Sequence, residues 1–122
     1  MTRVLIADDA SFMRQMIRDI IEPEGFEVVG EASDGVEVVE KFKELLPDMV
    51  MMDIVMPKRS GIDAVKGIMT MDPTARVVMC SALGQETLVM EAIQAGARDF
   101  IVKPFKPEAV VASLRKALEK ES

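Results

Sequence analysis

The chain contains no histidine, tryptophan or tyrosine, and it has one cysteine, Cys80, among its 122 residues. Without histidine it lacks the side chain that most often serves as general base or metal ligand, and it cannot form a phosphohistidine. A single cysteine excludes an internal disulfide framework and fits a reducing compartment. Any nucleophile must therefore be Asp, Glu, Ser, Thr, Cys or Lys.

Long hydrophobic runs are also missing. No apolar run approaches the roughly 18 residues that a membrane-spanning helix needs, and Asp8 and Asp9 interrupt the only early one, so no signal-peptide pattern opens the chain. The formal net charge is −6, which disfavours nucleic-acid binding. We therefore expect a protein of the cytoplasm that binds neither membrane nor nucleic acid.

What the sequence does contain is an alternation of strand and helix patterns. Apolar runs predict five strands, at 4–7, 27–31, 49–52, 76–80 and 99–102. Apolar residues three and four apart predict five helices, with apolar faces at 13–21, 38–46, 62–69, 88–93 and 111–118.

This alternation predicts an α/β fold with an open, doubly wound parallel sheet, in a single domain of residues 1–122. A closed barrel would need about eight such units. The continuously apolar strands 4–7, 49–52 and 77–80 should be central, whereas 27–31, with its glutamates and glycine, should lie at an edge.

Charged and polar residues follow these strands where they end. Asp8 and Asp9 follow the first strand and Asp53 the third, while Ser81 and Lys103 follow the fourth and fifth. The carboxyl ends of parallel strands face one crevice, so these side chains should converge. Two like charges about 4 Å apart repel by roughly 4 kcal/mol at an effective dielectric of about 20. The cluster therefore calls for a hard divalent cation and suggests phosphate chemistry.

Together these motifs resemble those of receiver domains of bacterial and archaeal response regulators. The matching pieces are Asp8-Asp9, Asp53 with Met56-Pro57 and Gly61, Ser81-Ala82, and Lys103-Pro104-Phe105, in family order along the whole chain. The runs 9–14 and 80–85 are most similar to stand-alone chemotaxis regulators of the CheY type. The resemblance implies the flavodoxin-like strand order 2-1-3-4-5, of which CheY is itself a type example.

The resemblance also implies a role for each residue. Asp53 would be the phosphoacceptor. Mg²⁺ would be held by Asp9, Asp53 and the backbone carbonyl of Val55, with Asp8 acting mostly through water. Lys103, preceding a cis bond to Pro104, would contact the phosphoryl group, and Ser81 would donate its hydroxyl to it. Phe100 occupies the aromatic switch position, and Val55 and Leu83 flank the path of a hydrolytic water.

The implied function is a switch driven by phosphorylation. A chemotaxis-type histidine kinase would donate the phosphoryl group, and the chain would catalyse its own phosphorylation and dephosphorylation rather than act as a conventional enzyme. The face made by residues 84–119 would then bind the motility apparatus or an adaptor protein. We expect a monomer.

Each of these residues, taken alone, could also have a purely structural role. Asp8 or Asp9 could cap the helix that starts near Ser11, and Asp53 could be a loop or capping residue. Ser81 could cap the next helix, which starts near Gly84. Lys103 alone could be a solvated lysine at a strand end, and Phe100 could be an ordinary core or half-exposed strand residue.

Three other functions compete with the switch. An aspartyl phosphatase usually needs a second acid two residues after its nucleophile, where this chain has Val55. A flavin carrier would need a hydroxyl-rich phosphate loop where Asp8 and Asp9 would repel phosphate. A receiver excised from a larger DNA-binding transcriptional regulator stays open, although Met1 and the polar end 119–122 favour a complete protein.

Overall fold

The computed structural model describes residues 1–119, and the end of the chain, 120–122, lies outside the described residues. Within residues 1–119, five parallel strands form one sheet in the order β2-β1-β3-β4-β5. The strands are β1 (Thr2–Ala7), β2 (Phe26–Ala32), β3 (Met49–Asp53), β4 (Val77–Ser81) and β5 (Asp99–Val102). The predicted fold class and strand order are confirmed.

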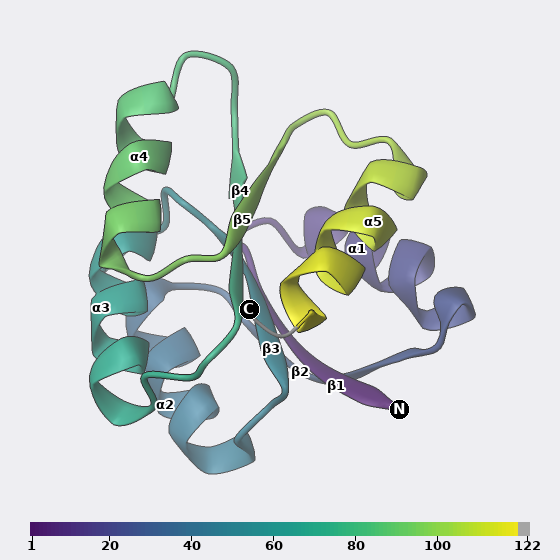
Figure 1. The fold of residues 1–122 in the computed structure, drawn as a ribbon, viewed down its shortest axis with the longest axis horizontal. Coiled ribbons are helices and arrows are strands. Elements are labelled where there is room, and N and C mark those ends of the chain that lie inside the picture. Colours follow the sequence, from purple (N-terminus) through teal and green to yellow (C-terminus); the bar gives the residue numbers. More distant parts are fainter. Residues whose placement is uncertain (120–122) are drawn as a thin grey trace.

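Among the described residues, five α-helices cover the two faces of this sheet, and a short 3-10 helix, η1 (Glu22–Glu24), follows the first of them. The α-helices are α1 (Ser11–Ile21), α2 (Gly35–Leu45), α3 (Gly61–Met71), α4 (Glu86–Ala95) and α5 (Pro107–Leu118). Figure 1 shows α2, α3 and α4 on one face and α1 and α5 on the other. The open sheet is therefore doubly wound, with both faces shielded from water.

Side-chain alternation along the central strands builds a separate core on each face. Leu5 and Ala7 of β1 pack in the core beneath α2, α3 and α4, whereas Val4 and Ile6 pack in the core beneath α1 and α5. Strands β1, β3 and β4 are buried along nearly their whole length, as their continuous apolar runs predict. Strand β2 lies at an edge, as its glutamates and glycine predict.

Polar caps fix where two helices begin. The Asp34 carboxylate accepts hydrogen bonds from the amides of Val36 and Glu37, and the Ser60 hydroxyl accepts one from the amide of Asp63. Helix α4 begins at Glu86, two residues later than expected, because Gly84 adopts a left-handed φ of 88° that a helix cannot include.

The loop between β3 and α3 turns back tightly against the strand it leaves. The Gly61 amide donates to the Ile54 carbonyl at 2.9 Å. A Cβ atom at Gly61 would lie 2.8 Å from that same carbonyl oxygen and would also meet the carbonyl of Asp53. Only glycine therefore lets α3 begin beside the end of β3, and this contact fixes the path of the chain after Asp53.

We expect Gly61→Ala to lower the free energy of unfolding by roughly 1–3 kcal/mol, because backbone rather than a flexible side chain must yield to the added methyl group. Denaturant unfolding measures the change. Gly67→Ala in the same helix is the control, since its methyl would meet only the end of the Arg59 side chain, at 3.1 Å. That variant should be neutral or stabilised by up to about 1 kcal/mol. Equal losses in the two variants would contradict the steric argument.

Candidate functional site

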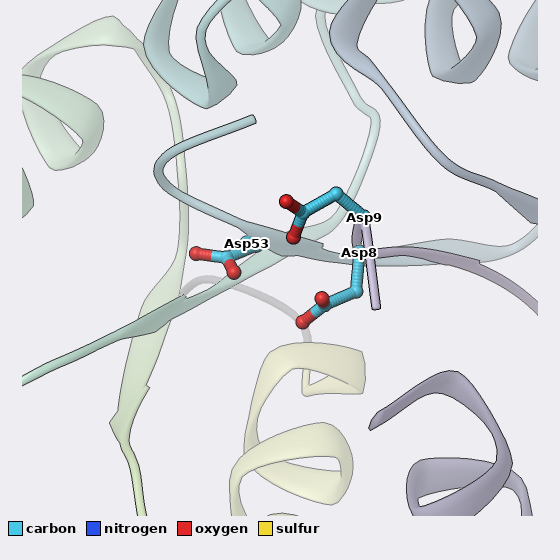
Figure 2. A group of neighbouring side chains, drawn as sticks. All are labelled: Asp8, Asp9 and Asp53. Atoms are coloured by element: carbon cyan, nitrogen blue, oxygen red, sulfur yellow. The ribbon is translucent and has the colours of Figure 1, made fainter. Parts of the chain in front are cut away.

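Three carboxylates meet at the carboxyl edge of the sheet. Asp8 and Asp9 directly follow β1, and Asp53 ends the neighbouring strand β3. One carboxylate oxygen from each lies within 4.8 Å of the others, and Figure 2 shows the three side chains gathered at these strand ends. Asp8 is buried, Asp53 is half-buried and Asp9 is exposed. The site therefore offers only oxygen ligands, and it is open to solvent on the side of Asp9.

Lys103 brings one cation into this cluster. Its Nζ lies 3.0 Å from Oδ2 of Asp8 and 2.8 Å from Oδ2 of Asp53. The peptide bond from Lys103 to Pro104 is cis, as the resemblance implied. One ammonium cannot balance three carboxylates, so the cluster keeps a net negative charge that suits a divalent cation.

Burial and ion pairing shift the pKa values of Asp53 and Lys103 in opposite directions. Burial raises the pKa of Asp53, and the hydrogen bonds from Lys103 and from the Val55 amide offset that rise only in part. Burial lowers the pKa of Lys103, but its hydrogen bonds to Asp53 and Asp8 outweigh burial and leave the pKa above its usual value. The ammonium of Lys103 stays charged, and a further cation nearby would stabilise the ionised form of the Asp53 carboxylate.

The two aspartates after β1 are held differently. The Asp8 amide donates to the Ala32 carbonyl at 3.0 Å, and Oδ1 of Asp8 accepts from the Ala10 amide at 2.9 Å. Among residues 1–119, no hydrogen bond or ion pair holds the Asp9 carboxylate. The N-cap of α1 is Ala10, without a side-chain cap, so the interpretation of Asp8 or Asp9 as a helix cap is wrong.

Ser81 lies on β4, the strand beside the one that carries Asp53, and Phe100 lies on β5, the next strand along the sheet. Ser81 is the last residue of β4 and is only 1% exposed. The N-cap position of α4 is Gln85, so the interpretation of Ser81 as a helix cap is wrong. Phe100 on β5 is 43% exposed, which agrees with a half-exposed strand residue and not with a core residue. An open, mostly apolar pocket of about 220 Å³ is lined by both residues together with Leu83 and Met90.

Val55 and Leu83 sit in the two loops at this edge. Val55 follows β3, and its amide donates to Oδ1 of Asp53 at 3.2 Å. Val55 is 52% exposed, and Leu83, after β4, is 81% exposed. Both loops therefore present apolar side chains to solvent close to the strand ends that carry Asp53 and Ser81.

Sequence reasoning did not single out two residues that contact the loops of the site. Arg14 of α1 donates from Nη1 to the Asp8 carbonyl at 2.6 Å, and Gln85 accepts from the Ala82 amide at 2.7 Å. The sequence held one signal for the first, since Arg14 and Arg18 are four apart on a helix and so share a face. Nothing in the sequence indicated that this face meets Glu31.

The fold and this cluster define a doubly wound α/β protein with an acidic site at the carboxyl edge of its sheet. The profile of the response regulator receiver domain matches residues 4–115. The chain is 61% identical over 114 residues to chemotaxis protein CheY of Thermotoga maritima, covering 93% of this chain and 95% of that protein. It is 56% identical over 116 residues to chemotaxis protein CheY of Bacillus subtilis, covering 95% and 97%. The chain belongs to the response regulator receiver domain family and is of the CheY type, as its motifs predicted.

Solved structures agree with this assignment. The CheX-CheY-BeF3-Mg²⁺ complex from Borrelia burgdorferi contains a chain that matches with a TM-score of 0.93 and 40% identity, covering 98% of this chain and 90% of that one. Within residues 1–119, no helix is both long and apolar enough to span a membrane.

We expect Lys103→Met to lower the free energy of unfolding by roughly 1–3 kcal/mol without divalent ions, because it leaves two neighbouring carboxylates unpaired. This is less than for a fully buried pair, since water reaches the lysine. The deficit should shrink as the pH falls through the raised pKa of Asp53, because protonation removes the repulsion. Denaturant unfolding at several pH values measures both effects.

The control is Lys106→Met, the same change at an exposed lysine three residues further on. It should alter stability by less than about 0.5 kcal/mol. If the two variants lose the same stability, the ion pairs of Lys103 do not stabilise the cluster.

Proposed function

We propose that the protein is a phosphorylation-activated signalling switch of a chemotaxis-type two-component system, in which Asp53 accepts a phosphoryl group from a histidine kinase. The observation that carries the proposal is the convergence of Asp8, Asp9, Asp53 and Lys103 at one sheet edge. The chain has no histidine, so the phosphohistidine must belong to a separate kinase.

Asp53 would act as the nucleophile. One of its carboxylate oxygens forms a bond to phosphorus while the bond from phosphorus to the kinase imidazole breaks, and the imidazole leaves with the electron pair. A carboxylate attacks an anionic phosphoryl group poorly unless the charge is neutralised. The Lys103 ammonium, already 2.8 Å from Asp53, supplies part of that charge, and Ser81 would donate its hydroxyl to a phosphoryl oxygen.

Asp8, Asp9, Asp53 and the Val55 carbonyl would hold Mg²⁺. The donor set fits this ion, because it consists of oxygen atoms, carries more negative charge than Lys103 balances, and includes the carboxylate of Asp9, which has no partner among residues 1–119. When bound, Mg²⁺ would neutralise charge on the transferring phosphoryl group. The similar Borrelia burgdorferi complex contains CheY with BeF3 and Mg²⁺.

The pocket between Ser81 and Phe100 would carry the signal outward. Movement of Ser81 toward a phosphoryl group would leave room for Phe100, which is 43% exposed, to turn inward. This would shift the population toward a different packing of the face made by residues 84–119. We propose that this face binds the motility apparatus or an adaptor protein, and that the protein acts as a monomer in the cytoplasm.

We expect incubation with a small-molecule phosphodonor and Mg²⁺ to add one phosphoryl group at Asp53, detected by intact mass and peptide mapping. Asp53→Asn should abolish labelling, because an amide is not a comparable nucleophile. Asp48→Asn, at an acid just before β3, is the matched control and should label like the wild type. Full labelling of Asp53→Asn at another residue would overturn the assignment of the acceptor.

The aspartyl phosphate should hydrolyse slowly. Val55 and Leu83 are apolar and exposed, so neither side chain can orient an attacking water, and both can shield the phosphorus. We expect Val55→Asn and Leu83→Glu to shorten the lifetime of the label at fixed Mg²⁺, by about tenfold for each 1.4 kcal/mol taken from the barrier. Met90→Gln, on α4, is the control for surface polarity. An unchanged or longer lifetime in the double variant would show that shielding is not the cause.

A further inference from the structure

We propose that Arg14 is a positioning residue for the acidic site, which holds the peptide group between Asp8 and Asp9 and so sets the affinity of the site for a divalent cation. The inference rests on the proposed function only in taking Mg²⁺ as the ion. It concerns a residue outside the cluster that contacts it through the backbone.

Arg14 is fixed from two sides. Its Nε lies 2.8 Å from Oε1 of Glu31 on β2, and its Nη1 lies 2.6 Å from the Asp8 carbonyl oxygen. The other carboxylate oxygen of Glu31 accepts from Nη2 of Arg18 at 2.7 Å. The Arg14 side chain is only 17% exposed, and hydrogen bonds from a guanidinium are stronger and more directional than those between neutral groups. The guanidinium therefore links β2 rigidly to the chain segment that carries the aspartates.

Asp9 depends on this link more than Asp8 does. Asp8 has three other anchors, namely its amide to Ala32, its Oδ1 to the Ala10 amide and its Oδ2 to Lys103. The Asp9 carboxylate has no partner of its own among residues 1–119, so its position follows from the backbone on either side. The Asp8 carbonyl belongs to the peptide group that leads into Asp9, and Arg14 is the side chain that holds it.

The charge of Arg14 acts in the opposite direction to its hydrogen bond. A guanidinium this close to the cluster repels a divalent cation, so on charge alone the removal of Arg14 would tighten Mg²⁺ binding. If Arg14 positions Asp9, its removal weakens binding instead, as the loss of groups that orient metal ligands typically does. The sign of the change therefore separates the two roles.

Arg18 provides the matched control. It lies on the same helix and shares the carboxylate of Glu31 with Arg14, but its hydrogen bonds go to Glu31 and Glu22 and none goes to residues 8–10. Arg18→Ala thus deletes the same charge nearby without loosening the Asp8 carbonyl.

The experiment is a calorimetric Mg²⁺ titration at low salt of wild type, Asp9→Asn, Arg14→Ala, Arg14→Lys and Arg18→Ala, each without phosphodonor. We expect Asp9→Asn to lose most of the affinity and Arg14→Ala to bind about tenfold more weakly than wild type. Arg14→Lys, which keeps the charge and one donor, should be intermediate, and Arg18→Ala should bind as tightly as wild type or more tightly. In the Mg²⁺-free proteins, the amide NMR signals of Asp9 and Ala10 should shift more in Arg14→Ala than in Arg18→Ala.

The outcomes distinguish the two proposals. If the wild type binds no Mg²⁺, the proposed function fails and this inference fails with it. If the wild type binds Mg²⁺ and Arg14→Ala binds equally well or better, only the positioning role of Arg14 is overturned. Should Arg14→Ala not fold, Arg14→Lys and Arg18→Lys decide, since both keep the charge, and equal affinities in that pair overturn the inference.

Discussion

Repulsion among three carboxylates at one sheet edge is the constraint on which the rest of the structure depends. The strand order places β1 beside β3, so Asp8, Asp9 and Asp53 must lie together. At such distances each pair of like charges repels by several kcal/mol at an effective dielectric of about 20. The protein tolerates this because Lys103 arrives from the end of β5 and contacts two of the three. The negative charge that Lys103 does not balance would attract a divalent cation.

The fold around this edge of the sheet restrains the site residues through core packing and specific loop contacts. Two apolar cores fix the strands from both faces, while the site residues lie at strand ends and in loops, where functional groups gather on rigid folds. Each loop has its own restraint, with Gly61 packed against the carbonyl of Ile54, Gln85 accepting from Ala82 and Arg14 holding Asp8. The unfavourable cluster of carboxylates persists because the two cores and the loop contacts hold its residues in place.

The sequence predicted most of the fold and the members of the cluster because both follow from local pattern. Continuous apolar runs mark central strands, and residues placed at strand ends converge in any parallel sheet. The strand order came from resemblance, since apolar runs alone do not say which strands are neighbours. The contact between Arg14 and Asp8 was missed because it depends on how α1 is rotated against β2, which spacing does not fix. The start of α4 was misplaced because Gly84 adopts a left-handed conformation that its residue type permits but does not require.

Stability and function make opposite demands on this cluster. A neutral residue in place of one aspartate would relieve repulsion and favour the folded state, but it would also remove an oxygen ligand. A second cation like Lys103 would balance the charge permanently and so exclude a divalent ion. The observed compromise pairs Asp8 and Asp53 with one ammonium and leaves Asp9 exposed and unpartnered within residues 1–119. Residues that face such opposed demands are the ones at which a protein gives up stability for its site. We therefore interpret the negative charge that Lys103 leaves unbalanced as a functional property of the site.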